Sequence, residues 1–226
     1  MVEHRCHDGY SIDLTLDPQK PDALHGDPPG IQSMGPGGVS YYVSNTRMDV
    51  KGTLGVDCTF FGCRDLEVTG LAWHDHQWGD FSMTGYAGWD WYSLQFDDDT
   101  ELMLYLIRSD SGGLATAAGS FVTKEGRTVH LTADDFVVTP SGHSWTSPAT
   151  GAVYPLGWRV QVPRFGIDVA VAPVMDDQEM DTKATTGIAY WEGDVRASGS
   201  RKGVGYVELT NYDRHPTPGA SAPKGP

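Results

Sequence analysis

Glycine and proline divide this chain into short segments, and that spacing leaves no room for a long helix. The 226 residues include 28 glycines and 14 prolines, which separate brief apolar runs along the whole length. No long segment repeats its apolar residues with the period of a helix. Short apolar runs bounded by turn residues are typical of β-strands joined by tight turns. The sequence therefore predicts an all-β protein whose neighbouring strands are antiparallel.

The apolar runs define the predicted strands. We expect strands at residues 10–16, 39–44, 48–54, 66–78, 86–96, 101–108, 119–123, 128–131, 136–139, 158–162, 167–171, 187–195 and 203–211. The tetrapeptide 97–100 is typical of a hairpin tip, and the strand that follows it is apolar on both faces. A strand of that kind should be covered on both sides, at the centre of the sheet. A sheet with this many strands closes into a barrel or splits into a sandwich, and a barrel of about eight strands can hold one small ligand.

We expect a single β-domain with short flanking segments. Residues 1–38 are predicted to form an N-terminal strand and an irregular linker, residues 39–213 a β-barrel, and residues 214–226 a disordered tail. His4, Cys6 and His7 stand close together. They are interpreted as a frayed terminus, because a structural zinc site needs four ligands with a defined spacing.

Charge and hydropathy exclude several kinds of partner. The chain carries 30 acidic and 16 basic residues, a net charge of −14, which repels phosphate backbones. Nucleic acid is therefore not expected as a partner. No apolar run approaches the roughly 20 residues of a membrane-spanning helix. We read no signal peptide, so the expected location is the cytoplasm for the chain as given and outside the cell for a processed form.

Two cysteines lie on either side of a predicted hairpin turn. Cys58 and Cys63 bracket the tetrapeptide 59–62. They are close enough to form a disulfide across the hairpin in an oxidising compartment, or they remain two free thiols near a turn.

The densest chemistry lies in the segments 70–79 (GLAWHDHQWG) and 88–92 (GWDWY). Successive side chains on a strand point to opposite faces, so His76 and Trp78 share a face opposite to Asp75. The same rule means that either Asp90 or the two tryptophans beside it can line a given cavity, but not both. No Gly-x-Ser-x-Gly motif is present, which argues against an α/β-hydrolase. Ser40 and Ser44 are possible nucleophiles only if a histidine reaches them.

An ordered series of sequence segments resembles a known family. The segments are 24–26 (LHG), 35–47 (GPGGVSYYVSNTR), 70–79, 88–92, 177–182 (DQEMDT) and 190–193 (YWEG). Together they resemble the lipocalin-like family of AttH proteins and carotenoid 1,2-hydratase, over residues 24–212. The resemblance implies a lipocalin-like antiparallel β-barrel with a short extra N-terminal strand segment.

The resemblance also implies what the rest of such a protein contains. Family members look like two consecutive lipocalin-type domains, and this chain resembles the second of them. A face normally covered by the first domain would be exposed, so we predict a homo-oligomer in which a second subunit covers it. Family activities include hydration of a carbon–carbon double bond and cyclisation of polyketide-like chains. Where the hydratase branch has an acidic residue two positions after a strand tyrosine, this chain has Ile107.

Adding water to a substrate requires one group that gives a proton and another that positions or deprotonates water. The predicted catalytic residues are His76, Asp90, Tyr105 and Glu192. Each also has a structural interpretation: a buried histidine bonded to backbone, an aspartate paired with Arg47, a satisfied buried tyrosine and a solvent-facing glutamate.

Aromatic rings can form a shape-selective wall for an apolar ligand. The predicted substrate-binding residues are Tyr42, Arg47, Trp78, Trp89, Trp91 and Trp191. Each tryptophan can equally be part of the core. His74 and His76 can in principle share a metal, but no metal and no cofactor is expected.

Three functions remain open. The leading hypothesis is an enzyme that adds water to a hydrophobic small molecule, by ester hydrolysis or alkene hydration, in a β-barrel pocket. The alternatives are a carrier that binds an apolar metabolite without turnover, and a cyclase that acts through the shape of its pocket.

Overall fold

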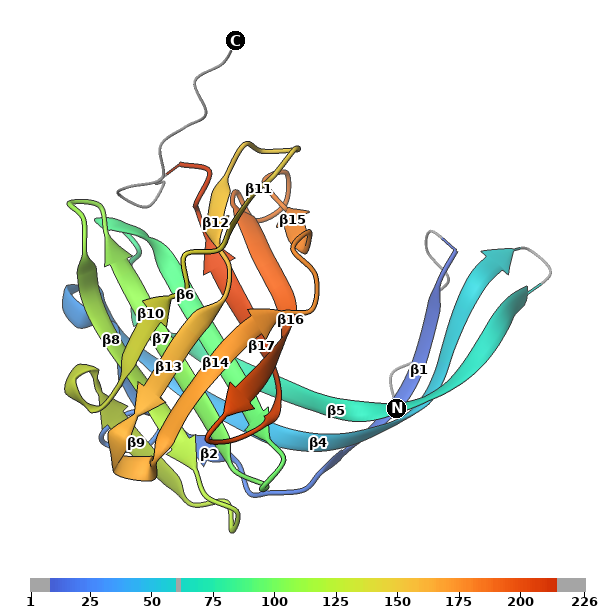
Figure 1. Cartoon of the computed structure of the whole chain (residues 1–226), viewed down its shortest axis with the longest axis horizontal. Coiled ribbons are helices and arrows are strands. Elements are labelled where there is room, and N and C mark those ends of the chain that lie inside the picture. The colour runs from blue at the N-terminus through green and yellow to red at the C-terminus, as the bar shows by residue number, and fades with distance from the viewer. Residues whose placement is uncertain (1–8, 60–61, 215–226) are drawn as a thin grey trace.

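The computed structural model describes residues 9–59 and 62–214, which form two large sheets and one small one (Figure 1). Within these ranges all the paired strands are antiparallel, as predicted, and the three short helices are 3-10 turns. In the described part of the chain, no helix has the length and apolar character needed to cross a membrane.

The ten-stranded sheet curls into an incomplete barrel. Its strands are β6 (Tyr86–Phe96), β7 (Glu101–Ser109), β8 (Leu114–Val122), β9 (Thr128–Thr132), β10 (Val137–Pro140), β13 (Trp158–Val162), β14 (Ile167–Pro173), β15 (Glu179–Asp181), β16 (Ala189–Gly199) and β17 (Gly203–Thr210). The order is β10-β13-β14-β16-β17-β6-β7-β8-β9, with β15 paired to β16. The strands β9 and β10 lie at opposite edges of this order, yet only the 3-10 turn η2 (Ala133–Asp135) and Phe136 separate them along the chain. The two edges therefore approach each other, which gives the sheet its lipocalin-like curvature.

The five-stranded sheet is built on one long hairpin. Its strands are β1 (Ser11–Pro18), β2 (Ala23–Leu24), β3 (Ile31–Ser33), β4 (Gly38–Thr59) and β5 (Gly62–Phe81), and a 3-10 turn η1 (Gly35–Gly37) leads into β4. A register shift between Asn45 and Met48 divides the hairpin into two parts. The first, here called the cover, comprises β2, β3, residues 38–45 of β4 and 73–81 of β5, and it packs against the barrel.

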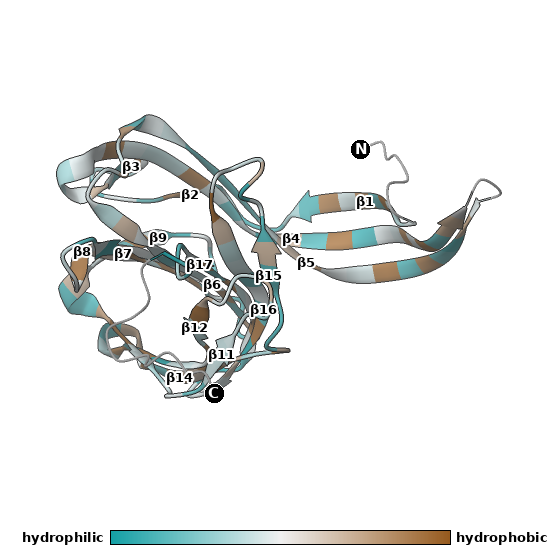
Figure 2. Cartoon of the chain, turned by 90° about the horizontal axis from the view of Figure 1, so that it is seen from above, coloured by the Kyte–Doolittle hydropathy of each residue, from teal (hydrophilic) through white to brown (hydrophobic). Residues whose placement is uncertain are grey.

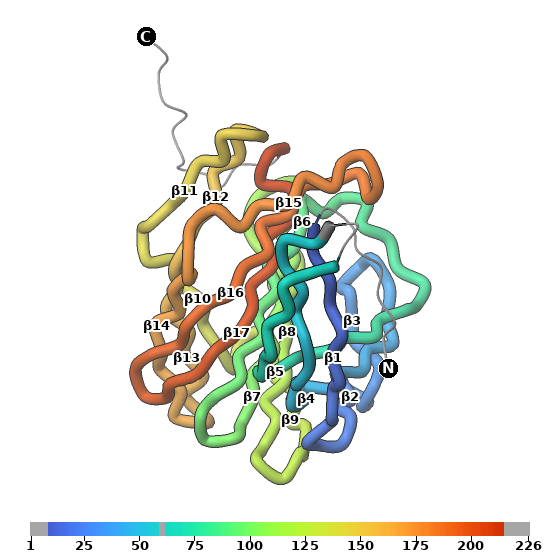
Figure 3. Tube along the Cα trace, turned by 90° about the vertical axis from the view of Figure 1, so that its right-hand side faces the viewer, coloured from blue at the N-terminus to red at the C-terminus, as the bar shows by residue number. Residues whose placement is uncertain are grey.

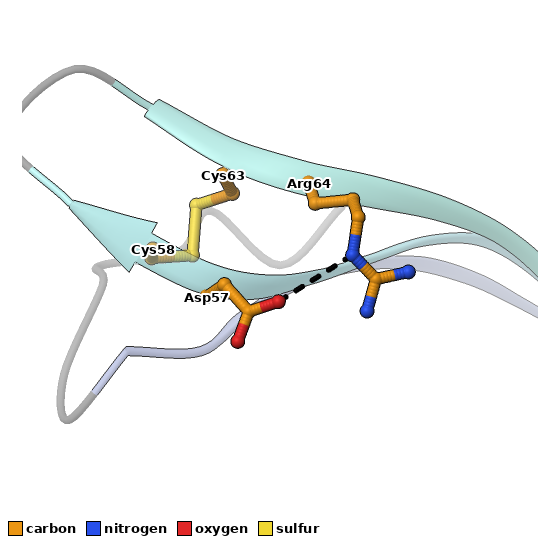
Figure 4. The surroundings of a disulfide bond; sticks show 4 residues. All are labelled: Asp57, Cys58, Cys63 and Arg64. Atoms are coloured by element: carbon orange, nitrogen blue, oxygen red, sulfur yellow. Dashed lines mark hydrogen bonds and ion pairs between the residues drawn. A yellow bond between two sulfur atoms is a disulfide. The ribbon is translucent and has the colours of Figure 1, made fainter.

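The second part of the hairpin, here called the arm, comprises β1, residues 48–59 of β4 and 62–72 of β5. It projects away from the barrel in Figure 1, and Figure 3 looks along it with the barrel strands behind. Figure 2 shows apolar and polar bands alternating along it. A disulfide joins Cys58 and Cys63 near its tip, beside the exposed pair of Asp57 and Arg64 (Figure 4).

The core has two layers, one on each face of the curled sheet. Alternate residues of β6 and β7 point into the barrel, where Tyr92, Leu94 and Leu104 pack against Trp158 and Trp191. The intervening residues point outward and pack under the cover, where Tyr42 and Met34 contact Met103, Tyr105 and Ile107. Because β7 supplies both layers, it is buried along most of its length, as its two apolar faces predicted.

The remaining differences from the sequence prediction concern the boundaries. The ten-stranded sheet begins at Tyr86 rather than at Val39, because β4 and β5 pair with each other and with β1–β3 instead of joining the barrel. The predicted strands 39–44 and 48–54 are one strand with a bulge. The short strands β2, β3, β15, β11 (Ser144–Thr146) and β12 (Val153–Pro155) were missed because segments of two or three residues carry no periodicity. The predicted frayed N-terminus, with His4 and Cys6, lies outside the described residues, as does most of the predicted tail.

Candidate functional site

A cleft lies between the cover and the barrel, and Trp91 stands in the middle of it. On one side of Trp91 is an apolar cavity of about 140 Å³, lined by Met34, Tyr42, Gln77, Phe81, Met83, Trp89, Tyr105 and Ile107. On the other is a larger cavity of about 440 Å³, lined by Leu71, Ala72, Trp73, Asp75, Ser93, Gln95, Asp194, Val204, Gly205 and Tyr206. The cleft therefore offers aromatic walls with a few polar groups, which is the usual composition of a small-molecule site.

Strand alternation decides which part of the 70–79 segment reaches this cleft. Trp73, Asp75 and Gln77 line it. His76 and Trp78 lie on the opposite face of β5, where the His76 ring packs edge-on against Trp78 at 4.7 Å. Trp78 is 48% exposed. His76 and Trp78, predicted as a catalytic and a substrate-binding residue, are thus separated from the cleft because the apolar barrel face attracts the other side of the strand.

Asp75 is held by several hydrogen-bond donors. The Trp73 indole nitrogen donates to its carboxylate at 2.7 Å, and the Ser44 hydroxyl donates to the same oxygen. The Tyr42 hydroxyl also hydrogen-bonds this carboxylate. Asp75 keeps surface open to the cleft, yet the surrounding protein raises the pKa of its carboxyl group, chiefly by desolvation, against the lowering effect of these donors.

Behind Asp75 runs a buried chain of polar side chains. His25 lies between two serines, with Nε2 2.7 Å from Ser44 Oγ and Nδ1 2.9 Å from Ser120 Oγ. Burial lowers the pKa of His25 to about 3, so its ring is neutral at physiological pH. Since Ser44 donates to Asp75, the hydrogen-bond pattern requires His25 to donate from Nε2 and to accept from Ser120 at Nδ1. A histidine does reach Ser44, but the serine is directed at a carboxylate.

A second carboxylate lies beside Trp91 on the same face of the barrel sheet, as its cross-strand partner. Glu208, on β17, accepts a 3.0 Å hydrogen bond from the indole nitrogen of Trp89. It pairs across the strands with Glu192 on β16, whose carboxylate accepts a 3.2 Å hydrogen bond from Tyr206. Desolvation, followed by repulsion from Glu192, raises the pKa of Glu208 to about 7, and Asp75 adds to that repulsion. Glu208 therefore lies in the electrostatic field of two other carboxylates, those of Glu192 and Asp75.

The aromatic residues of the cleft are tied to the rest of the site. The Trp91 indole nitrogen donates to the Tyr42 hydroxyl at 3.0 Å, which joins barrel to cover. Tyr105, also in the cleft wall, donates its hydroxyl proton to the backbone oxygen of Ser33 at 2.8 Å. Burial raises the pKa of the Tyr105 phenol far above its usual value. Tyr105 is therefore a fixed, neutral wall residue.

Two predicted substrate-binding residues lie away from the cleft. Arg47 forms a 2.6 Å ion pair with Glu101, whose side chain is fully buried and also meets Lys20 at 2.8 Å. These contacts fasten the N-terminal linker to the barrel. Trp191 is fully buried in the barrel core and donates to the backbone oxygen of Asp176 at 2.7 Å. Both side chains are committed to structural contacts.

Asp90 lies on the barrel side of β6, opposite to Trp89 and Trp91, as strand alternation requires. It pairs with Arg108 at 3.1 Å and accepts a 3.0 Å hydrogen bond from Tyr212. Desolvation raises its pKa to about 6, with Arg108 opposing the shift. Asp90 therefore belongs to a different cavity, at the mouth of the barrel.

Asp75 and Glu208 are the functional candidates that sequence reasoning missed. Residues 73–78 alternate between two faces of a strand. Turning the face that carries Asp75 toward the barrel would have predicted Asp75 as a site residue. Glu208 carries no local motif, and only the β17–β6 pairing places it beside Trp89 and Trp91. Within the described residues, no three His, Cys, Asp or Glu side chains group in a way that suits a metal ion.

A curled antiparallel sheet with an aromatic cleft on its outer face defines a protein of lipocalin-like fold. Residues 3–212 match the AttH-like family model, and the chain belongs to this family. The crystal structure of an AttH protein from Nitrosomonas europaea superposes with a TM-score of 0.83 at 34% identity, over 92% of this chain and 64% of that one.

Two relatives carry the name kievitone hydratase. The protein from Fusarium solani subsp. phaseoli is 27% identical over 151 residues, which is 62% of this chain and 40% of that protein. The crystal structure of the enzyme from Nectria haematococca has the same fold, with a TM-score of 0.73 at 20% identity over 91% of this chain and 62% of that one. The chain thus spans between two fifths and two thirds of the length of the relatives it matches.

Proposed function

We propose that this protein adds water to an unsaturated, largely apolar small molecule in the cleft between cover and barrel. The observation that supports this most directly is a pair of carboxylates, Asp75 in the lining of the cleft and Glu208 as the cross-strand neighbour of Trp91 on the barrel sheet. The indoles of Trp73 and Trp89 hold them by hydrogen bonds. Hydration needs one acid and one base, and aromatic walls suit an apolar substrate. The 27% identical relative named kievitone hydratase supports the same reaction type.

The environments of the two carboxylates suggest their roles. Glu208 has one indole donor and a pKa of about 7, so a large fraction holds a proton at neutral pH. It is the proposed acid, giving that proton to one alkene carbon. Asp75 has donors from Trp73, Ser44 and Tyr42, which favour its charged form. It is the proposed base, taking a proton from the water whose oxygen bonds to the other carbon.

The proposed reaction leaves the total number of protons on the two carboxyl groups unchanged. Glu208 loses one proton and Asp75 gains one, so the product carries one added water. Glu192, the cross-strand neighbour of Glu208, helps to keep Glu208 protonated by repulsion. Tyr105 and Trp91 are the proposed substrate-contacting walls.

The test is water addition by the purified protein, measured by mass spectrometry. Kievitone, which appears in the name of two relatives, is the first compound, followed by other unsaturated apolar molecules. We expect Asp75→Asn and Glu208→Gln to reduce the rate by about 10²-fold or more. Asp65→Asn, on the same strand in the arm, is the matched control and should keep the rate.

His76→Ala distinguishes the structure-based site from the sequence-based one. We expect near wild-type turnover, since His76 lies on the far face of β5. A large loss in His76→Ala with an active Asp75→Asn would overturn the proposal. Tight binding of these compounds without turnover would favour the carrier function instead.

Self-association remains a prediction. The arm presents Ile12, Leu16, Leu66 and Leu71, and Tyr10 lies just before it, at exposures between 37% and 62%. Apolar exposure of this extent favours association, so we propose a homo-oligomer in which the arm is covered by a second copy. Sedimentation velocity would show a monomer at all concentrations if this were wrong.

A further inference from the structure

The barrel mouth contains a second cavity that the proposed hydration does not use. It has a volume of about 500 Å³ and opens between β6, β7, β10 and the residues after β17. Its walls include the apolar side chains of Leu106, Leu114, Val138 and Trp158. The sheet itself separates it from the cleft, because the two sites lie on opposite faces of β6.

A largely buried ion pair meets a tyrosine in the wall of this cavity. Asp90 and Arg108 each keep 14% of their side-chain surface exposed and lie 3.1 Å apart. Tyr212 donates to the carboxylate of Asp90 at 3.0 Å, and the Arg108 guanidinium lies 4.0 Å from the centre of the Tyr212 ring. Burying an ion pair costs desolvation energy that apolar residues of similar size would avoid. A pair placed in the wall of an apolar cavity therefore points to recognition of a ligand.

The lack of a side chain at Gly88 leaves room for the Arg108 guanidinium. A Cβ atom added at Gly88 would lie 2.6 Å from the Arg108 guanidinium and 2.7 Å from the backbone oxygen of Thr210. Arg108 also donates to that oxygen. The 88–92 segment thus serves two sites, with Trp89 and Trp91 in the cleft and Asp90 and Tyr92 at the barrel mouth.

The charges around the cavity select the class of ligand. Two arginines, Arg108 and Arg214, and two aspartates, Asp90 and Asp110, line it, so the lining is balanced in charge. A balanced lining gives no advantage to an anion or a cation. The carboxylate of Asp90 and the hydroxyl oxygen of Tyr212 both accept hydrogen bonds. A ligand that donates one proton there keeps its remaining surface against the apolar walls.

We propose that the barrel mouth is a second binding site, for an uncharged, mainly apolar small molecule whose hydroxyl group donates a hydrogen bond to the hydroxyl oxygen of Tyr212, which itself donates to Asp90. This site is independent of the proposed hydration, because none of its residues belongs to the cleft.

The experiment compares three probes by isothermal titration calorimetry on the whole chain: 2-naphthol, naphthalene and 2-naphthoate. We expect saturable one-to-one binding of 2-naphthol, and binding of the other two at least about tenfold weaker, the equivalent of about 1.4 kcal/mol. Naphthalene lacks the donor, and naphthoate brings an uncompensated charge to Asp90.

Variants locate the bound probe. Ala87→Leu fills the barrel mouth and should abolish 2-naphthol binding, while Tyr212→Phe keeps the shape and should weaken it by about tenfold, since one hydrogen bond to a polar head is lost. Leu71→Trp and Met83→Trp fill the two cavities of the cleft and should leave 2-naphthol affinity unchanged. Thermal unfolding midpoints identify any variant that is misfolded, and Tyr212→Phe then carries the test.

Three results would overturn the inference. One is the absence of saturable 2-naphthol binding to the wild-type chain. Another is loss of binding in the two cleft variants with retention in Ala87→Leu and Tyr212→Phe, which would place the probe in the cleft. The third is equal or tighter binding of naphthalene or 2-naphthoate, which would remove the hydroxyl as the recognised group.

Discussion

The indole nitrogen of Trp91 donates a 3.0 Å hydrogen bond to the hydroxyl of Tyr42, and this contact joins the barrel to the cover across the cleft. Trp91 comes from β6 and Tyr42 from β4, so their meeting depends on how the hairpin folds over the curled sheet. The Tyr42 hydroxyl hydrogen-bonds Asp75 in turn, which links a barrel tryptophan to a carboxylate of the cover. The wall of the site is thus also part of the junction between the two sheets.

Removal of the Tyr42 hydroxyl should weaken this junction. Tyr42→Phe leaves the Trp91 donor without its partner in a largely dry layer, which costs about 1–3 kcal/mol of unfolding free energy. Chemical denaturation monitored by fluorescence measures the change. Tyr41→Phe, on the opposite face of β4 with 46% exposure, is the matched control and should change stability by less than about 0.5 kcal/mol. Equal effects of the two substitutions would contradict this role.

Glu208 should make stability depend on pH in a defined direction. Its pKa rises from 4.5 to about 7 on folding, so the folded protein holds this proton more tightly than the unfolded chain does. The sign of the linkage is that Glu208 lowers stability progressively as pH rises from about 4.5 to about 7, with the full loss present above that range. Glu208→Gln removes the titration, so the variant should gain about 1–3 kcal/mol relative to wild type across this window.

The measurement for Glu208 is the difference in unfolding free energy between variant and wild type at several pH values. Glu67→Gln, in the exposed arm, controls for loss of a carboxylate elsewhere. A Glu208→Gln difference that stays constant from about pH 4 to about pH 8, a range that brackets the unfolded and folded pKa values, would show that this group does not titrate as described.

Arg47 should affect stability more than ligand binding. It pairs with Glu101, whose side chain is fully buried, and donates to the backbone oxygen of Phe96 at 2.8 Å. Arg47→Ala leaves a buried carboxylate with one cation fewer, which costs about 3–5 kcal/mol. Arg64→Ala, which removes the exposed pair with Asp57, should cost less than about 1 kcal/mol. If denaturation showed Arg47→Ala to be as stable as Arg64→Ala, a role for Arg47 in substrate binding would regain support.

Gly88 should tolerate no side chain. An added Cβ atom would meet the Arg108 guanidinium at 2.6 Å and the backbone oxygen of Thr210 at 2.7 Å, and the oxygen cannot move without disturbing the β17–β6 pairing. Gly88→Ala should therefore destabilise the fold by about 1–3 kcal/mol. Gly70→Ala, on β5, is the control, because a Cβ atom added there would have no neighbour within 4 Å. Thermal unfolding of both variants checks the prediction, and equal midpoints would refute it.

Much of the fold was predictable from local pattern. The short apolar runs marked most strands, and the two apolar faces of residues 101–108 marked β7 as central. The spacing of Cys58 and Cys63 also allowed the disulfide that joins them. The alternation rule separated Asp90 from Trp89 and Trp91, and the structure places them in different cavities. These features depend on neighbours in sequence, so the sequence can report them.

Part of the candidate cleft could be predicted from the sequence. Tyr42, Tyr105, Trp89, Trp91 and Glu192 were identified in sequence, and all lie in or beside the cleft. His76 and Asp75 lie on opposite faces of one strand, and periodicity says which residues share a face but not which face meets the barrel.

The sequence by itself determined the strands, the alternation of their faces and the density of aromatic and acidic residues in two short segments. Only the tertiary structure decided that β4 and β5 cover the barrel, that Asp75 lies on the cleft side of β5 and that Glu208 stands beside Glu192 and Trp89. The physical reason is that local pattern records backbone geometry, whereas the pKa and partners of a side chain depend on strands that are distant in the chain and pair only when the apolar faces come together.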